Sequence, residues 1–568
     1  MLGIRIKNEF LDLYSNTRLQ FELNSPMYLG EDIDIIQGSY SFPATVPLGG
    51  KNRRLLNYPN LIDNADDLMK DEPCEIYVEG MMLFSGLLSV RSAINNQAKI
   101  YMIVSPLSQL KDVNLNELDL GTENMGGDVA SILAKAKDTT TSPESYNYIF
   151  FPVYNRDFFS GNSDYGDPVD GKGEYQNFWD VDTQAFVIDA DNNIFTPFVK
   201  VNHILKTGIE DQGFTFTNNF QKSTELQRLV MYNNYSSVAD DKPLLDINLA
   251  DHVNPDTSFS DFVKRLSRNF CLGLFGDFQN ETFELTPLKD IINLPPKWNW
   301  TSKASGTYTL EANEDIPGLF KYESPYEAAP DGQKFSESYD QIDWEDETND
   351  IAGYTTPLTN KKVYETTTDT VYSYVETSLG VVGPILFRRH IGYYKANQSR
   401  KESYEAKMKT LYMINRISKI GVGGTNWLIP SIAQQGGILG EKESFDDRLI
   451  LYRGMENTAN DDLYPFAANN IYNYDKNVSQ IGGSDVNYSL MWDRDAGLFN
   501  QWWKDWYAVF DKRRMSIYKL NLSVKDIISF SFKDRVVIKN MEYYVKRLKI
   551  SISMKGLEQT EAELIAIL

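Results

Sequence analysis

The chain contains few of the residues on which disulfide scaffolds and common metal sites depend. Its 568 residues include two cysteines and three histidines. Two cysteines cannot form a disulfide framework, and such a small set of thiolate and imidazole ligands argues against a zinc site of the usual types. We therefore expect no metal and no cofactor.

Long apolar runs are also missing. A membrane-spanning helix needs roughly 18 or more nearly uninterrupted apolar residues. The most apolar candidate, 417–440, contains Lys419, Asn426 and Pro430. Charged residues interrupt the start of the chain, 1–7, which excludes the apolar centre of a signal peptide. We expect a protein without a membrane segment that is synthesised in a cytoplasm.

Acidic residues outnumber basic ones, 79 to 56, which gives a net charge of -23. Binding DNA along a surface requires clustered cations, so this charge balance argues against a general DNA-binding surface. Hydrophobic residues make up 42% and aromatic residues 13% of the chain, enough to build cores and to exclude global disorder. At roughly 150 residues per domain, the length predicts three or four domains.

Two segments resemble ligand-binding loops but depart from them at essential positions. The segment 166–173 approaches a phosphate-binding loop, but Gly173 stands where Ser or Thr must hold Mg²⁺. The segment 189–193 resembles the start of a calcium loop, but Ile194 and Lys200 replace the required Gly and Glu. We interpret the first as a surface turn and the second as a hairpin turn.

Catalytic side chains are not indicated elsewhere. No Gly-x-Ser-x-Gly motif occurs, and His203, His252 and His390 lack flanking patterns typical of a general base, so we interpret them as structural. Cys74 and Cys271 lie in apolar runs and are predicted to be buried thiols. Among so many carboxylates, no pair can be selected for glycoside hydrolysis. The sequence predicts a protein that is not an enzyme, and it leaves its binding residues unassigned.

Both ends of the chain have the alternation typical of half-buried strands. Leu19, Phe21 and Leu23 alternate with polar residues, short strands joined by tight turns follow over 74–104, and Leu548 opens a similar alternation near the C-terminus. Between them, helical spacing occurs in three stretches, which lie at 129–136, 201–208 and 259–270. Ser258 and Asp261 supply a capping pattern for the third stretch.

One internal similarity connects the two ends. Residues 75–81 can be placed over 535–541, so that Gly80 and Asn540 both become turn residues between two strands. At the same offset, Leu88 and Val90 coincide with Leu548 and Ile550. This similarity favours two related β modules, although the general pattern of β-hairpins could also produce it.

The aromatic segment around Trp502 allows two interpretations. Its large side chains recur at the spacing of one helix face, and they are Phe499, Trp502, Trp503, Trp506 and Phe510. This spacing favours a helix that packs an aromatic stripe on a core or on a neighbouring subunit. The alternative is a surface that stacks on glycans.

These patterns predict a mainly β fold with α+β insertions. We expect two related small β-barrel domains, one at each end, with helical and mixed domains between them. The boundaries are an N-terminal barrel at 1–120, an α+β domain at 121–290, second-barrel strands with a long polar insertion at 291–485, and the aromatic helix with the last barrel strands at 486–568. The acidic run 343–347 is interpreted as a solvated loop, and the role of 325–480 is left open.

Several further segments, in order along the chain, carry a resemblance to a known type of protein, and none of them is a catalytic motif. They are Phe84–Gly86, Ser105–Leu107, Leu118–Gly121, Thr196–Val199, Leu229–Tyr232, Phe283–Asp290, Leu498–Trp503, Lys519–Ser523, Asp526–Ile528 and Asp534–Leu548. Together they resemble the baseplate or tail-tip hub proteins of long-tailed bacteriophages of the T-even and Mu-like type, in the style of phages of Bacteroidetes hosts. The stretch 325–480 resembles nothing in these proteins.

The resemblance implies a structural virion protein at the tail tip. It implies a homotrimer in which two similar barrels per chain give six near-equivalent modules, so that a sixfold tail tube can meet a threefold spike. The implied partners are a tail tube or distal tail ring protein, a central spike or fibre protein and the tape-measure protein. DNA would pass through the channel without being specifically bound. The alternative is a tail-tip adhesin that binds host glycans through its aromatic residues.

Overall fold

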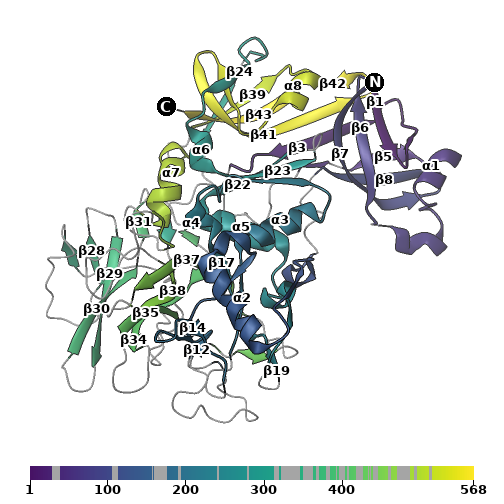
Figure 1. Ribbon diagram of the computed structural model, residues 1–568. Helices are drawn as coiled ribbons and strands as arrows, with labels where there is room; N and C mark the ends of the chain where they lie inside the picture. Colours follow the sequence, from purple (N-terminus) through teal and green to yellow (C-terminus); the bar gives the residue numbers. More distant parts are fainter. Residues whose placement is uncertain are drawn as a thin grey trace.

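The computed structural model contains mainly strands, with short helices concentrated in the middle of the chain (Figure 1). The described residues are 1–27, 39–41, 43–68, 70–104, 113–155, 158, 175–189, 194–239, 242–277, 281–306, 308–312, 319–321, 346–348, 362–365, 370–378, 384–391, 393–395, 403–405, 408–417, 426–432, 434, 436–438, 445–457, 462–469, 487–490, 496–510 and 514–567.

Strands from the two ends of the chain form one 15-stranded sheet. Purple N-terminal strands and yellow C-terminal strands lie next to each other in Figure 1. The central path is β2 (Glu9–Phe10), β1 (Leu2–Ile6), β6 (Glu72–Val78), β7 (Met81–Ile94), β8 (Gln97–Val104), β4 (Ser39–Ser41), β3 (Arg18–Asn24), β41 (Met541–Ser553), β43 (Thr560–Ile567), β39 (Arg514–Leu520) and β25 (Thr309–Ala312). Beside it lie β5 (Ala44–Pro47), β24 (Pro296–Asn299), β40 (Arg535–Ile538) and β42 (Gly556–Leu557).

The sheet forms because its strands have one apolar and one polar face. Leu19 and Phe21 of β3 are buried together with Ile550 and Ile552 of β41. A single hydrophobic core joins these residues to side chains from β1, β6, β7, β39 and β43. The two ends of the chain therefore share one core.

A second, larger core lies under the helices of the middle region. The helix α5 begins as expected, because the Ser258 side chain accepts a hydrogen bond from the backbone N–H of Asp261. The helices are α1 (Gly50–Leu55), α2 (Val129–Thr141), α3 (Val201–Glu210), α4 (Thr224–Gln227), α5 (Phe259–Phe270), α6 (Leu288–Ile292), α7 (Lys504–Phe510) and α8 (Val524–Ser529). The predicted helices at 129–136, 201–208 and 259–270 are thus confirmed.

The remaining strands form small sheets around and beyond these helices. The two-stranded sheets are β9 (Thr122–Asn124) with β21 (Asp246–Asn248), β10 (Tyr148–Ile149) with β15 (Phe198–Val199), β13 (Trp179–Asp180) with β14 (Ala185–Phe186), β18 (Tyr235–Ser236) with β36 (Gly437–Ile438), and β19 (Val238–Ala239) with β20 (Lys242–Pro243).

The larger of these sheets have three or four strands. The three-stranded sheets are β16 (Thr215–Asn218), β23 (Thr282–Pro287) and β22 (Leu272–Asp277), and β31 (Tyr393–Lys395), β26 (Leu319–Lys321) and β32 (Ser403–Glu405). The four-stranded sheets are β12 (Tyr175–Gln176), β11 (Val153–Tyr154), β35 (Asn426–Ser431) and β34 (Tyr412–Ile417); β17 (Leu229–Tyr232), β37 (Arg448–Asn457), β33 (Lys409–Thr410) and β38 (Leu463–Ala468); and β27 (Asp346–Thr348), β28 (Lys362–Glu365), β29 (Thr370–Ser378) and β30 (Pro384–Ile391).

The expectation of a mainly β fold is confirmed. The strands that the sequence assigns to two separate barrels lie in one sheet, and two closed barrels remain a prediction. Of the acidic run, only Asp346 and Glu347 belong to the described residues, and both lie in β27. None of the helices formed by the described residues is long and apolar enough to cross a membrane.

Candidate functional site: two matching strand modules and their junction

Two hairpins at opposite ends of the chain have the same turn. The β6–β7 turn has positive φ at Glu79 (55°) and Gly80 (82°), and the β40–β41 turn has positive φ at Lys539 (50°) and Asn540 (66°). Positive φ at both central residues is typical of the type I′ turn, whose twist suits a two-residue hairpin. The flanking pairs also correspond, since Val78 faces Met81 in β6–β7, and Ile538 faces Met541 in β40–β41.

The strand that follows each hairpin, β8 or β43, pairs with the second hairpin strand in the same register. In β7–β8, Leu87 faces Ile103, Leu88 faces Met102 and Ser89 faces Tyr101. In β41–β43, the pairs are Arg547 with Glu563, Leu548 with Ala562 and Lys549 with Glu561. Each residue of the second set follows its counterpart by the same offset, 460 positions (87 to 547, 103 to 563). A chance similarity between two hairpins would not extend to the register of a third strand.

The correspondence extends over two further strands and a helix. One row of facing residues crosses four strands in each half: Glu22, Tyr40, Ile103 and Leu87 at the N-terminus, and Thr309, Ile517, Glu563 and Arg547 at the C-terminus. The short helices α1 and α8 occupy the same place in strand order. We call β3, β4, β5, α1, β6, β7 and β8 the N-terminal module, and β25, β39, α8, β40, β41 and β43 the C-terminal module.

Strand β5 of the N-terminal module has no separate counterpart in the C-terminal module, and the outer strand that flanks each hairpin also differs between the two halves of the sheet. Strand β1 runs antiparallel to β6 in the N-terminal half, whereas β24 runs parallel to β40 in the C-terminal half. The repeated unit therefore comprises the strands from β3 to β8 and from β25 to β43, without β5 and without this outer strand. Its presence supports the sequence interpretation of two related β modules over that of unrelated hairpins.

The modules join edge to edge through β3 and β41. These strands pair antiparallel from Arg18–Ser553 to Asn24–Arg547. On one face, Leu19, Phe21 and Leu23 lie opposite Ile552, Ile550 and Leu548, and all six side chains are buried. Apolar burial therefore fixes this register, because a shift of one residue would turn the apolar side chains outward.

Charged groups occupy the other face of the junction. Arg547 Nη1 donates to Glu22 Oε1 at 2.6 Å, and the same guanidinium forms an ion pair with Glu563 of β43. Lys549 Nζ lies 3.1 Å from Glu561 Oε1 and 3.4 Å from Glu563 Oε1. Burial opposes the charge on Arg547, but the hydrogen bonds that it donates to Glu563 and Glu22 raise its pKa above the ordinary value. This cluster ties three strands of both modules together.

The two thiols are buried, as predicted. Burial, with a smaller contribution from Glu75, raises the pKa of Cys74 to about 12, and burial also raises the pKa of Cys271. A thiol with so high a pKa holds its proton at neutral pH and is a poor nucleophile.

A serine, a histidine and an asparagine lie together in the middle region. Ser237 Oγ and His252 Nε2 are 2.9 Å apart, and His252 Nδ1 lies 3.2 Å from Asn233 Oδ1. The order of groups is that of a nucleophile, a base and an orienting residue. All three residues are fully buried, so a substrate could reach Ser237 only if the core opened. We interpret the group as a hydrogen-bond network that satisfies buried polar atoms.

The other two predicted structural histidines lie apart from this network. His203 Nε2 lies 2.8 Å from the Leu120 carbonyl oxygen. His390 belongs to β30 and faces Tyr372 of β29. The contacts of His203 and His252 agree with a structural role, and the role of His390 stays a prediction.

The aromatic segment packs inward. It begins as a π-helix, Phe499–Trp503, and continues as α7, and Phe499, Trp502, Trp503 and Trp506 are all buried. Trp506 Nε1 donates to the Met27 carbonyl at 2.8 Å, and Trp503 Nε1 donates to the Asn269 carbonyl at 3.2 Å. The stripe thus packs on a core, and these three tryptophans are not available to stack on a glycan.

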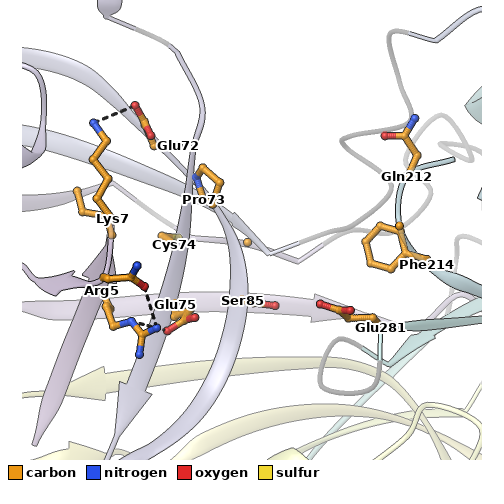
Figure 2. Close-up of a pocket in the computed structure, with 14 residues that line it drawn as sticks. Arg5, Lys7, Glu72, Pro73, Cys74, Glu75, Ser85, Gln212, Phe214 and Glu281 are labelled. Carbon is orange, nitrogen blue, oxygen red and sulfur yellow. Dashed lines mark hydrogen bonds and ion pairs between the residues drawn. The ribbon is translucent and has the colours of Figure 1, made fainter. Parts of the chain in front are cut away.

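A cavity of about 720 Å³ lies between strands β1, β6 and β7 and the segment after α3 (Figure 2). On one side its wall carries two ion pairs, Arg5 with Glu75 at 3.0 Å and Lys7 with Glu72 at 3.2 Å. Phe214 lies on the opposite side (Figure 2). The charges of the two ion pairs neutralise one another, the nearby Cys74 thiol is protonated, and Glu281 adds a further carboxylate to the lining.

The loop-like motifs contribute no site to the described chain. Residues 166–173 lie outside the described residues, and of 189–193 only Asp189 is described. Within the described ranges, no group of three or more His, Cys, Asp or Glu residues could hold a metal ion.

Comparison with known proteins gives structural neighbours only. No family model and no curated protein matches the chain. Similar solved structures include a 43 kDa tail protein of prophage MuSo2 from Shewanella oneidensis (8% identity, 99% of this chain and 98% of that chain covered, TM-score 0.35), a tail protein from Neisseria meningitidis MC58 (7%, 99% and 95%, 0.34) and the prophage tail protein gp18 from Listeria monocytogenes EGD-e (7%, 99% and 93%, 0.31). TM-scores this low do not establish a common fold.

The junction residues were not identified from the sequence. Glu22 and Arg547 are 525 positions apart, and neither belongs to a motif. The available signal was the alternation around Phe21 and around Ile550, which predicts two strands without indicating that they pair.

Proposed function

We propose that this chain is a structural protein of a bacteriophage tail. In this proposal it is the trimeric hub of the tail tip or baseplate, where it adapts a sixfold tail tube to a threefold central spike or tape-measure bundle. It acts by shape and symmetry and catalyses no reaction. Its place is the virion, at the tail tip, after synthesis in the host cytoplasm.

The internal repeat is the observation that carries this proposal. Both modules have the same strand order, the same I′ turn and the same register, and they share one sheet and one core. A chain with two near-equivalent modules can contact six similar subunits of a tube when three copies assemble. The hub-like segments at both ends, Phe84–Gly86 and Asp534–Leu548, lie within these modules.

The acidic composition suits a channel that conducts DNA. Carboxylates on a channel wall repel phosphates and so keep DNA from binding as it passes. We expect the purified protein, with its net charge of -23, to bind no duplex DNA at physiological salt in a mobility-shift assay. Retarded DNA would contradict a channel of this kind.

The oligomeric state tests the hub proposal directly. Native mass spectrometry should give three times the 65.0 kDa chain mass, and class averages from electron microscopy should have threefold symmetry. A monomer that persists at all concentrations would contradict the proposal. Trp502, Trp503 and Trp506 are buried, so they do not supply the exposed aromatic surface that the adhesin alternative requires.

A further inference from the structure

The cavity of about 720 Å³ has the size of a ligand site, because pockets that hold small ligands measure about 300–1,000 Å³ (Figure 2). One wall comes from β1, β6 and β7, and the other from 212–214 and Glu281 in the middle region. Glu281 is exposed, whereas Ser85 and Phe214 are half-buried. Solvent, and with it a ligand, can therefore reach the cavity from outside.

Three polar side chains of this cavity are free to bind a ligand. Ser85, Gln212 and Glu281 form no side-chain hydrogen bond or ion pair with any residue that the structure describes. Figure 2 shows the Glu281 carboxylate pointing toward the wall on which Ser85 lies. A hydroxyl, an amide oxygen and a carboxylate all accept hydrogen bonds, so together they suit a ligand with several N–H donors.

The charges of the lining leave one carboxylate unmatched. Three carboxylates and two cations line the cavity, and two of the carboxylates pair with the cations. Glu281 is the third carboxylate, so the lining has a net charge of -1 (two positive and three negative groups). An unmatched carboxylate in a cavity attracts a cation, because a cavity screens the charge less than bulk water does.

An aromatic ring lies beside the unmatched carboxylate. The Thr215 N–H donates to the Glu281 carbonyl oxygen at 2.8 Å, which joins the two strand ends that carry Phe214 and Glu281. Phe214 packs edge to face on Phe283 with ring centroids 5.0 Å apart, so its ring is held in place. The face of such a ring attracts a cation. The middle region thus offers a carboxylate and an aromatic face to one cationic group.

The corresponding place on the C-terminal module has the opposite charge and is occupied. By the offset of 460 positions, Arg535 is the counterpart of Glu75. Arg535 Nη2 and the Tyr544 hydroxyl both donate to the carbonyl oxygen of Ile292, at the end of α6. On the N-terminal module the carboxylate of Glu75 stands in this place, and its ion pair and its hydrogen bond both use Oε2. The N-terminal hairpin therefore suits a donor where the C-terminal hairpin holds an acceptor.

We propose that the cavity binds an arginine side chain of another polypeptide. The guanidinium meets the Glu281 carboxylate and lies on the Phe214 ring, and its remaining N–H groups donate to Ser85 and Gln212. Arginine suits this set better than lysine, because its planar group has five N–H donors and also stacks on aromatic rings.

The net charge of the chain favours a different polypeptide as the source of the arginine. A chain with a net charge of -23 attracts a basic partner and repels a second copy of itself. The bound side chain would connect the N-terminal module to the middle region, as α6 connects the C-terminal module to it. The site lies within one chain, so it is present in a monomer and in a trimer alike.

A short peptide can serve as the probe. Ac-Gly-Arg-Gly-NH2 should bind the full chain saturably, with a dissociation constant of about 1 mM or below, as measured by ligand-observed NMR. Glu281→Gln changes an exposed side chain, so the fold should be preserved, and it should weaken this binding about tenfold or more. Neutral Ac-Gly-Gln-Gly-NH2 should not bind. If the arginine peptide showed no saturable binding to the natural chain, or bound both proteins equally, the proposal would be wrong.

The control carboxylate is Asp63, which is exposed and lies outside the lining of the cavity. Asp63→Asn removes the same charge and should leave the dissociation constant unchanged. Phe214→Leu keeps the side chain apolar but removes the ring face, and it should weaken binding about two- to fivefold. Equal losses for Glu281→Gln and Asp63→Asn would indicate a general attraction of cations to an acidic chain and would overturn the site.

Filling the cavity tests the location of the site without changing its charge. Ser85→Met places a longer side chain on the wall opposite Glu281 and should weaken peptide binding about fivefold or more. Circular dichroism and the melting temperature verify that this variant is folded. Unchanged binding would place the peptide elsewhere on the surface and contradict the cavity as its site.

Two further comparisons separate this site from a site for free polyamines and from the hub proposal. Spermidine, which has no guanidinium and no main chain, should bind more weakly than the peptide, and tighter binding of spermidine would contradict a polypeptide ligand. The oligomeric state is measured independently of these titrations. A trimer that does not bind the peptide supports the hub and contradicts the site, whereas a monomer that binds the peptide supports the site and contradicts the hub.

Discussion

The Arg547 guanidinium donates a 2.6 Å hydrogen bond to the Glu22 carboxylate across 525 positions of sequence. This contact links β41, the longest strand of the C-terminal module, to β3 near the N-terminus. The same guanidinium pairs with Glu563, and both carboxylates are buried. The chain ends are thus held together by an apolar face and by a charge cluster on the opposite face of the same strands.

Removing the cation should destabilise the junction. Arg547→Ala leaves Glu22 and Glu563 buried with Lys549 as the remaining cation of the cluster. Loss of one partner of a buried pair costs roughly 3–5 kcal/mol, and we expect the lower end of this range because Arg547 is partly exposed. In urea, the 15-stranded sheet of the variant should unfold at a lower midpoint concentration than that of the natural chain.

An exposed ion pair of the same strand system supplies the control for this experiment. Arg5→Ala removes the partner of Glu75 in a pair whose side chains are each about one third exposed, at 33% and 31%. Such pairs contribute about 0–1 kcal/mol, so the midpoint should hardly move. Equal effects of Arg547→Ala and Arg5→Ala would contradict the importance given to the buried cluster.

The matching turns predict which substitutions the hairpins tolerate. Gly80 and Asn540 are the second central residues of equivalent I′ turns, with φ of 82° and 66°. Gly80→Asn and Asn540→Gly should each change stability little, because both residue types adopt positive φ readily. Gly80→Val and Asn540→Val should each lower the free energy of unfolding by about 1–2 kcal/mol, because a β-branched residue is strained at positive φ. Thermal unfolding measures all four variants, and a different ranking at the two sites would contradict their equivalence.

The sequence predicted local features of the fold better than its long-range pairings. The spacing around Phe259 and the cap at Ser258 identified α5, because both signals lie within one helix. The similarity between 75–81 and 535–541 identified the repeated hairpin, because a two-residue turn and its flanking strands are encoded locally.

The pairing of β3 with β41 could not be predicted in this way. Alternating apolar residues state which face of a strand is buried but not which other strand lies beside it. The charged partners Glu22 and Arg547 were equally undefined, because any of 79 acidic residues could in principle pair with any of 56 basic ones. The expectation of separate barrels followed from treating each chain end by itself.

A buried lysine predicts a specific pH dependence. Burial lowers the pKa of Lys200 from 10.5 to about 8, with Glu144 opposing and Arg228 adding to this effect. Between pH 8 and 10.5 the unfolded chain therefore binds more protons at this residue than the folded one, so its contribution to stability increases as pH rises. The stability of Lys200→Met relative to that of the natural chain should be highest near pH 7. This difference in stability should shrink as the pH approaches 10.5.

Differences in melting temperature between the two proteins across this pH range measure the effect. The control is Lys206→Met, at an exposed position of α3, the helix that begins directly after Lys200, and identical pH profiles for the two variants would contradict an effect of burial at Lys200. If the difference in melting temperature between Lys200→Met and the natural chain did not change with pH, the lowered pKa of Lys200 would be contradicted.

The buried tryptophans predict a structural phenotype for changes in α7. Trp506 is fully buried, packs edge to face on Trp503 with ring centroids 5.5 Å apart, and donates its indole N–H to the Met27 carbonyl. Trp506→Ala should lower stability by roughly 3–5 kcal/mol through the cavity it leaves, and it also leaves a carbonyl without its donor. Trp298→Ala, at a partly exposed tryptophan of β24, should cost less. If Trp506→Ala left the melting temperature unchanged but abolished binding on a glycan array, the aromatic stripe would be a binding surface and its assignment to the core would be wrong.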